Sequence, residues 1–181
     1  MKKNGAWTAD EAKYHQVSLK LADWMSNYLP KEDVVIDFGC GNGYYMSRLE
    51  HQDFYTIGID DNDEITILCS DFIKHDLSTP IDLKIKGTVI SFETMEHIPK
   101  EFEQIAVDNL INHCNSILMM SWASVGQPGI GHINCQNFDY VKDLFESKGF
   151  ELLEKDTVEI RRNVDNNCSW FKRNLLIFKK L

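Results

Sequence analysis

Residues 34–43 read Val-Val-Ile-Asp-Phe-Gly-Cys-Gly-Asn-Gly, and this stretch decides the fold. The short apolar run 34–36 is typical of a parallel strand that is buried on both faces. The glycines that follow allow the backbone to turn tightly and to approach a ligand closely where a helix begins. Tyr44 stands where the dinucleotide fingerprint has its third glycine, which disfavours a pyrophosphate-binding loop. A P-loop is excluded because no Gly-Lys-Ser or Gly-Lys-Thr follows.

Strand-like runs alternate with helical segments along the chain. A first helix is predicted from the capping box at residues 8–11 to Pro30. Segments 99–114 and 138–148 are also predicted to be helical, with Gly149 as a left-handed stop after the second. This alternation predicts an α/β fold, a doubly wound, mostly parallel, seven-stranded, Rossmann-like sheet with helices on both faces. The seven predicted strands are 34–36, 54–59, 66–72, 88–92, 116–121, 150–153 and 175–178.

Composition limits the class of protein. With 181 residues, 43% of them hydrophobic and 26% charged, the chain is predicted to form a single domain over residues 1–181. The net charge of −9 disfavours a nucleic-acid substrate or an anionic membrane surface as a partner. No run of about 18 apolar residues predicts a membrane span. Five cysteines without Cys-x-x-Cys spacing predict reduced thiols in a cytoplasmic protein.

Four sequence motifs, which follow one another in the family's order, resemble those of the class I S-adenosylmethionine-dependent methyltransferases. Residues 34–43 resemble motif I of that family, and residues 57–60, Ile-Gly-Ile-Asp, resemble the end of its second strand. Residues 75–77, His-Asp-Leu, resemble the third motif of the family, and residues 90–99 resemble its fourth-strand signature. The resemblance implies a helix over residues 1–30 that covers the cofactor and a core over residues 31–181.

The resemblance also implies S-adenosylmethionine as the cofactor. Asp60 would accept hydrogen bonds from both ribose hydroxyls, and Asp76 would meet the adenine amino group. Asp71 competes with Asp76 for the second role because it also follows an apolar run. The expected cofactor-binding residues are Asp37, Phe38, Gly39, Cys40, Gly41, Asp60, Asp76, Leu77, Phe92 and Glu93.

His132 is the candidate catalytic residue. Methyl transfer depends mainly on proximity and alignment, and a hydroxyl acceptor also benefits from a base or a metal ion. Residues 122–134 follow the fifth predicted strand and carry three glycines and a proline before His132. Such a loop can deliver one imidazole to the mouth of the cofactor site, and histidine has the unperturbed pKa closest to neutrality. The alternative is a structural loop histidine.

A metal site is a second hypothesis for the same region. Glu93, Glu96 and His97 have the spacing i, i+3 and i+4, so one short helical turn would place them on one face. Together with His132 they form an oxygen and nitrogen donor set suited to Mg²⁺ or Mn²⁺. The set resembles the metal site of small-RNA 3′-terminal 2′-O-methyltransferases. A Glu-His pair after the fourth strand is also frequent in enzymes of this class that need no metal.

The acceptor is predicted to be a small molecule. Residues 121–134 and 170–175 resemble small methyltransferase domains found beside glycosyltransferases and thought to methylate sugar hydroxyls, so O-methylation of a sugar or glycan is expected. Trp122 could stack on a sugar face or lie in the core, and Trp7 and Tyr14 are equally ambiguous. The rivals are a metal-assisted RNA 2′-O-methyltransferase and a catalytically silent cofactor-binding partner domain. The remaining histidines, His15, His51 and His113, are expected on the surface.

Overall fold

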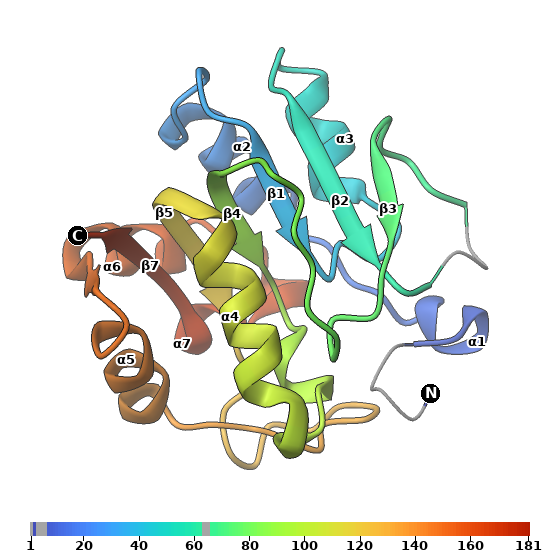
Figure 1. The fold of residues 1–181 in the computed structure, drawn as a ribbon, viewed down its shortest axis with the longest axis vertical. Coiled ribbons are helices and arrows are strands. Elements are labelled where there is room, and N and C mark those ends of the chain that lie inside the picture. The colour runs from blue at the N-terminus through green and yellow to red at the C-terminus, as the bar shows by residue number, and fades with distance from the viewer. Residues whose placement is uncertain (1, 3–6, 63–65) are drawn as a thin grey trace.

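The computed structural model describes residues 2, 7–62 and 66–181, and these form a three-layered α/β fold around one sheet (Figure 1). The sheet has seven strands in the order β3-β2-β1-β4-β5-β7-β6. Strands β1 to β5 are parallel, whereas β7 runs antiparallel to both β5 and β6. This confirms the predicted fold class. The strands are β1 (Val35–Phe38), β2 (Thr56–Asp60), β3 (Phe72–Lys74), β4 (Gly87–Ser91), β5 (Cys114–Ser121), β6 (Phe150–Leu152) and β7 (Leu175–Lys180).

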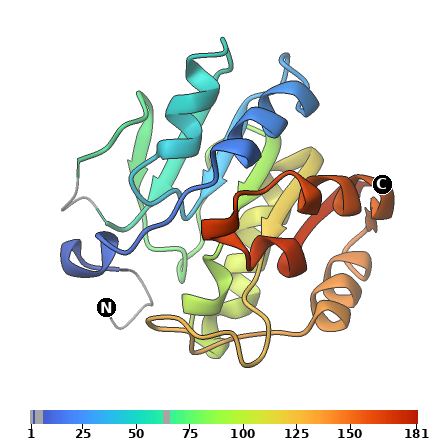
Figure 2. The ribbon, with the colours of Figure 1, turned by 180° about the vertical axis from the view of Figure 1, so that it is seen from behind.

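Helices cover both faces of the sheet, and each face has its own apolar core. On one face, α4 (Glu103–His113) and α5 (Phe138–Glu146) pack on the sheet through side chains such as Val107 and Phe145. The opposite face, seen in Figure 2, carries α2 (Leu19–Tyr28), α3 (Tyr44–Glu50), α6 (Glu154–Arg162) and α7 (Phe171–Asn174). The strand order reverses between β1 and β4, and ligands of such sheets bind outside the carboxyl ends of the strands at this switch point.

The predicted N-terminal helix is two helices instead of one. The capping box at Thr8 opens only the short α1 (Ala9–Ala12), with the Thr8 N–H donating to the Glu11 carboxylate at 2.8 Å. A second N-cap at Ser18 begins α2, and its hydroxyl accepts from the Leu21 N–H at 3.2 Å. A tertiary contact stabilises the break between α1 and α2, because the Ser18 hydroxyl also donates to Asp165 at 2.9 Å. Residues 1 and 3–6 of the predicted covering segment lie outside the described residues.

Two other expectations also change. The apolar run 66–72 was expected to be a strand, yet β3 covers only Phe72–Lys74. The Leu68 N–H donates to the Asn42 carbonyl at 2.8 Å, so this run packs back on the glycine loop instead of entering the sheet. Helix α6 (Glu154–Arg162) was not predicted, because six of its nine residues are charged and it buries only Thr157 and Ile160. No helix among the described residues is long and apolar enough to cross a membrane.

Gly39 and Gly149 both adopt positive φ angles but differ in their surroundings. Gly149 follows α5 with φ +84°, and a Cβ there would meet no atom within 4 Å. Gly39 follows β1 with φ +89°, and a Cβ there would lie 2.2 Å from Thr94 Oγ1. Position 39 therefore requires glycine both because of its positive φ angle and because the Thr94 side chain leaves no room for a Cβ.

Replacing each glycine by alanine separates these two effects. We expect Gly149→Ala to lower the free energy of unfolding by about 1 kcal/mol, the cost of a left-handed alanine. Gly39→Ala should lose about 2 kcal/mol more because Thr94 must move. Chemical denaturation of both variants measures the difference, and equal losses would show that Thr94 yields without cost.

Candidate functional site

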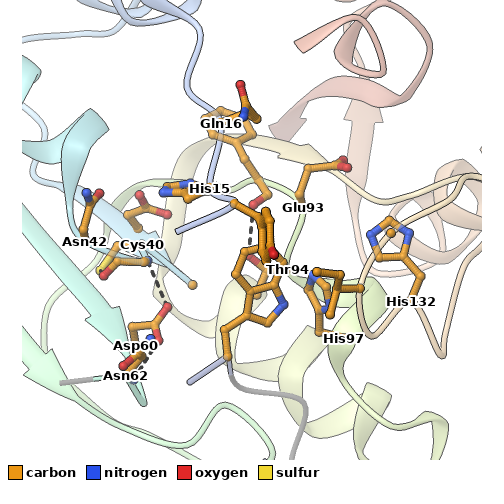
Figure 3. A pocket seen from close by; sticks show the side chains of 18 of the residues that line it. His15, Gln16, Cys40, Asn42, Asp60, Asn62, Glu93, Thr94, His97 and His132 are labelled. Atoms are coloured by element: carbon orange, nitrogen blue, oxygen red, sulfur yellow. Dashed lines mark hydrogen bonds between the residues drawn. The ribbon is translucent and has the colours of Figure 1, made fainter. Parts of the chain in front are cut away.

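A cavity of about 900 Å³ opens at the carboxyl ends of the strands. Volumes of this size are typical of sites for small molecules and cofactors. Asp60 and Asn62 lie at one side of the cavity, Glu93 and His132 lie at the other, and Thr94 and His97 stand between them (Figure 3). The glycine loop, the N-terminal segment 7–16, the loop after β5 and α7 all contribute to its wall.

The first end of the cavity is built by the glycine loop and Asp60. The Gly41 N–H donates to Asp60 Oδ2 at 2.9 Å, and the Asn62 N–H donates to Oδ1 at 2.8 Å. Burial nevertheless raises the pKa of Asp60, because these two donors only partly offset the loss of water. Each carboxylate oxygen keeps a second lone pair, so Asp60 can still accept hydrogen bonds from a ligand.

Asp37 stands behind the same loop and is only 3% exposed. Burial, together with the nearby Asp60 carboxyl, raises the pKa of Asp37 well above its ordinary value. Two carboxyl groups in one desolvated region favour a ligand that brings positive charge or hydrogen-bond donors.

The structure separates Asp76 from Asp71, the two candidates for the contact with the adenine amino group. Asp76 and Leu77 line the cavity, whereas Asp71 is exposed and does not line it. The Asp76 carboxylate accepts from the Ser78 N–H at 2.8 Å, which holds the turn after β3. Phe38 does not line the cavity either. Its side chain is fully buried in the core, so a direct cofactor contact through that side chain is wrong, although Gly39 and Cys40 do line the cavity.

His15 contributes to this end of the cavity and was not predicted from the sequence. The residue is exposed, as expected, but its ring lies over the glycine loop, 3.3 Å from where a Gly41 Cβ would be (Figure 3). The sequence predicted one helix through His15, whereas residues 13–18 belong to neither α1 nor α2, so the pattern gave no signal for this position. His113, also expected on the surface, is 3% exposed and accepts a hydrogen bond from the Leu83 N–H at 3.0 Å.

Glu93 links several segments at the second end of the cavity. Its backbone has φ +50°, and its N–H donates to the Ser121 hydroxyl at 2.8 Å. The carboxylate accepts from the Ser121 hydroxyl at 2.9 Å, from Gln127 Nε2 at 2.7 Å and from Asn174 Nδ2 at 2.6 Å. Burial still raises the pKa of Glu93 despite these donors. Gln127 and Asn174 were not predicted as site residues, since only the fold brings α7 beside the end of β4.

Glu96, His97 and His132 come together beside Glu93. The 3₁₀ turn η1 (Met95–His97) is the short turn that the sequence predicts, and it places Glu96 in a fully buried position. Potential ligand atoms of the three side chains lie within 4.8 Å of one another. Glu93 is not part of this cluster, so the predicted four-residue metal set is reduced to three.

The protonation of the two histidines is set by backbone carbonyl groups. His97 Nδ1 lies 3.1 Å from the Gly131 carbonyl, and His132 Nδ1 lies 3.1 Å from the Gln127 carbonyl. Because a carbonyl can only accept, each Nδ1 carries the proton and each Nε2 keeps a lone pair. Burial lowers the pKa of His97 to about 4 and also lowers the pKa of His132, so both rings are neutral at pH 7.

Glu96 is the fully buried carboxyl group of this cluster. Neither of its carboxylate oxygens has a hydrogen-bond partner among the described residues, and His132 Nε2 lies 3.8 Å from Oε1. Burial, with Glu93 nearby, raises the pKa of Glu96 well above its ordinary value. An unpartnered buried carboxyl costs free energy unless a proton or a cation joins it.

The loop after β5 is anchored so that it presents His132. The Glu96 carbonyl accepts from the N–H groups of Ile133 and Asn134 at 3.0 and 2.9 Å. The Asn134 side-chain amide donates to Glu103 at 2.8 Å. The backbone carbonyl of Asn134 accepts from Trp122 Nε1 at 2.6 Å. Trp122 is therefore 2% exposed and part of the core, so the alternative that it stacks on a sugar is wrong.

Comparisons with known proteins identify the fold. No family model and no curated protein matches the chain. A TehB-like methyltransferase structure from Corynebacterium glutamicum is 15% identical, with a TM-score of 0.68 over 94% of this chain and 92% of that chain. The chain has the fold of S-adenosylmethionine-dependent methyltransferases.

Two further structures show how widely this fold is used. Magnesium protoporphyrin IX methyltransferase from Synechocystis, with bound S-adenosylmethionine, is 18% identical, with a TM-score of 0.62 over 89% of this chain and 76% of that chain. The cyclase SpnF is 11% identical, with a TM-score of 0.62 over 89% of this chain and 80% of that chain. At these identities the likeness establishes the fold, and the reaction must be argued from the site.

Glu103 offers a test of the loop anchor. Burial acts to raise the pKa of Glu103, but hydrogen bonds from Lys100, Tyr140 and Asn134 outweigh it, so the pKa is lowered. Such a group stabilises the fold above its unfolded pKa of about 4.5, and this contribution is lost as the pH falls through the folded value. We expect Glu103→Gln to cost about 1.5 kcal/mol at pH 7 and progressively less below pH 4.5.

Denaturation curves at several pH values measure this effect. Glu101→Gln is the matched control, because Glu101 is exposed and makes no hydrogen bond or ion pair with the described residues. A pH-independent difference between Glu103→Gln and the wild type would contradict the assigned role of the carboxylate.

Proposed function

We propose that the protein transfers the methyl group of S-adenosylmethionine to a hydroxyl of a small molecule, a sugar or glycan. The observation that carries this proposal is that one cavity has Asp60 and the glycine loop at one end and the neutral His132 imidazole at the other. Both requirements of the reaction, a cofactor cradle and a base beside the acceptor, therefore meet in one space.

The residues of the first end fit the cofactor. Asp60 would accept from the ribose hydroxyls, and Asp76 and Leu77 would contact the adenine ring. Gly39 and Gly41, with their positive φ angles, would let the backbone approach the cofactor closely. Asp37 and Glu93 would lie near its cationic amino acid part, which suits their desolvated carboxyl groups. The magnesium protoporphyrin IX methyltransferase was crystallised with both S-adenosylmethionine and S-adenosylhomocysteine, which supports the same cofactor here.

When bound, the cofactor supplies a methyl group on a positively charged sulfur. The chain orients the acceptor, and His132 Nε2 takes the proton of the acceptor hydroxyl. The Gln127 carbonyl holds the His132 ring in the tautomer that this role needs. Gly129 fits the same assignment, because a Cβ there would lie 2.1 Å from His132 Nε2, so only glycine leaves room for the ring.

Several observations support a small acceptor. One structure of the same fold is a 1,6-didemethyltoxoflavin N1-methyltransferase and another is the porphyrin enzyme, so this fold serves small-molecule acceptors. The net charge of −9 argues against nucleic acid. The sugar or glycan acceptor, a cytoplasmic location and work beside glycosyltransferases rest on the sequence resemblance of residues 121–134 and 170–175.

Calorimetric titration of S-adenosylhomocysteine tests the cofactor site. We expect wild type to bind it and Asp60→Ala to bind about 30-fold more weakly or not at all, because hydrogen bonds to a charged group are lost. Asp71→Ala is the matched control and should bind as wild type, since Asp71 does not line the cavity. No binding to folded wild type would contradict the methyltransferase proposal and leave a degenerate scaffold.

A metal-assisted transfer is the second candidate, favoured by the cluster of Glu96, His97 and His132. The unpartnered Glu96 oxygens and the two free Nε2 lone pairs form a donor set that fits Mg²⁺ or Mn²⁺. The carbonyl groups behind each Nδ1 would orient the rings as outer-shell partners do in metal sites. His132 has one available lone pair, so it acts either as the base or as a ligand. The RNA 2′-O-methyltransferase alternative depends on this second role.

Thermal unfolding with and without Mn²⁺ distinguishes the two roles. If the cluster binds a metal ion, millimolar Mn²⁺ raises the Tm of wild type by mass action but leaves Glu96→Gln unchanged. His75→Asn is the control, because His75 lines the cavity outside the cluster. No shift in wild type would assign His132 to base catalysis, whereas an equal shift in Glu96→Gln would place the ion elsewhere.

A further inference from the structure

The cavity carries its charges asymmetrically. Four aspartates line the end with the glycine loop: Asp37, Asp60, Asp61 and Asp76. At the opposite end, Glu93 is the acidic side chain that lines the wall, and its oxygens already accept three side-chain hydrogen bonds. Carboxyl groups therefore gather at the glycine-loop end of the cavity, whereas the Glu93 carboxylate is already engaged by hydrogen bonds.

Hydrogen-bond donors at this second end lack partners. Trp7 Nε1 and Trp170 Nε1 are buried and have no hydrogen-bond partner among the described residues. Trp7 packs edge-on against His97, with the ring centroids 5.4 Å apart, so it lies beside the candidate catalytic cluster. Both indole side chains line the cavity, so their ring surfaces can contact a ligand there.

Arg173 adds a charged donor to the same end. It lines the cavity and is exposed, and its guanidinium makes no hydrogen bond or ion pair with any residue in the described part of the chain. The next residue, Asn174, donates to Glu93 and to Gln127 Oε1 at 3.3 Å, so α7 is fixed beside the acceptor end.

We propose that the methyl acceptor carries a carboxylate or phosphate group, which Arg173 binds while the body of the acceptor lies against Trp7 and Trp170. This inference rests on the proposed function and names its substrate class. Guanidinium groups bind carboxylates and phosphates through paired hydrogen bonds, which gives both affinity and orientation. The indole faces offer flat surface for a sugar or an aromatic ring.

Binding of matched charged and uncharged probes tests the proposal without knowledge of the acceptor. The probes are glucose 6-phosphate against glucose, glucuronate against its methyl ester, and 4-hydroxybenzoate against phenol. Saturation-transfer NMR with protein saturated by S-adenosylhomocysteine gives the relative affinity within each pair. The variants are Arg173→Ala and Arg173→Lys. Arg162→Ala is the matched control, because Arg162 is exposed and does not line the cavity.

We expect wild type and Arg162→Ala to bind the charged member at least about tenfold more tightly in one pair or more. Arg173→Ala should lose this preference while its affinity for S-adenosylhomocysteine stays unchanged, and Arg173→Lys should keep part of it. The pair that responds distinguishes a phosphate from a carboxylate acceptor. Equal binding of both members in every pair, no binding of any charged probe, or an unchanged preference in Arg173→Ala would overturn the proposal. If wild type does not bind S-adenosylhomocysteine, that result contradicts the proposed function itself.

Discussion

The buried carboxylate of Glu93 is the interaction on which the candidate site depends. It receives hydrogen bonds from the end of β5, from the loop after it and from α7, through Ser121, Gln127 and Asn174. Glu93 adopts a left-handed backbone conformation, which costs about 1 kcal/mol for a residue other than glycine. The hydrogen bonds hold the residue in this conformation. As a result, segments far apart in the sequence meet around one cavity.

Several buried carboxyl groups of the site lower the stability of the unliganded fold. Burial raises the pKa of Asp37, Asp60, Glu93 and Glu96, so the folded chain binds protons more tightly than the unfolded chain does. By linkage, each such group lowers the stability of the unliganded fold as the pH rises from its unfolded pKa through its folded pKa. Raised pKa values of this kind cluster at functional sites. A cationic ligand would recover part of the cost, and this explains why the sequence keeps carboxylates where a core would favour apolar side chains.

Local patterns predicted the elements that local physics determines. The glycine loop and the glycine-rich loop that carries His132 were predicted from local signals, because glycines after strands mark tight turns. Asp60 was predicted from the resemblance to the methyltransferase family, and the structure places Asp60 and His132 at one cavity. Phe38 was expected to contact the cofactor but is fully buried, and Trp122 takes the core position of its two alternatives, because burial depends on which face of the sheet or loop the fold covers. The Asn174 and Gln127 contacts with Glu93, and His15 above Gly41, arise from segments that meet only in three dimensions. A single sequence holds no signal for such contacts.

The fold by itself does not choose the reaction, since a cyclase shares it with methyltransferases. In this chain the proposed cofactor residues share one cavity with a cluster of Glu96, His97 and His132. The most direct test is the crystal structure of the protein grown with S-adenosylhomocysteine. The account predicts the ribose on Asp60, the adenine at Leu77 and the sulfur directed toward His132. A ligand bound outside this cavity, or turned so that its sulfur lies away from His132, would contradict it.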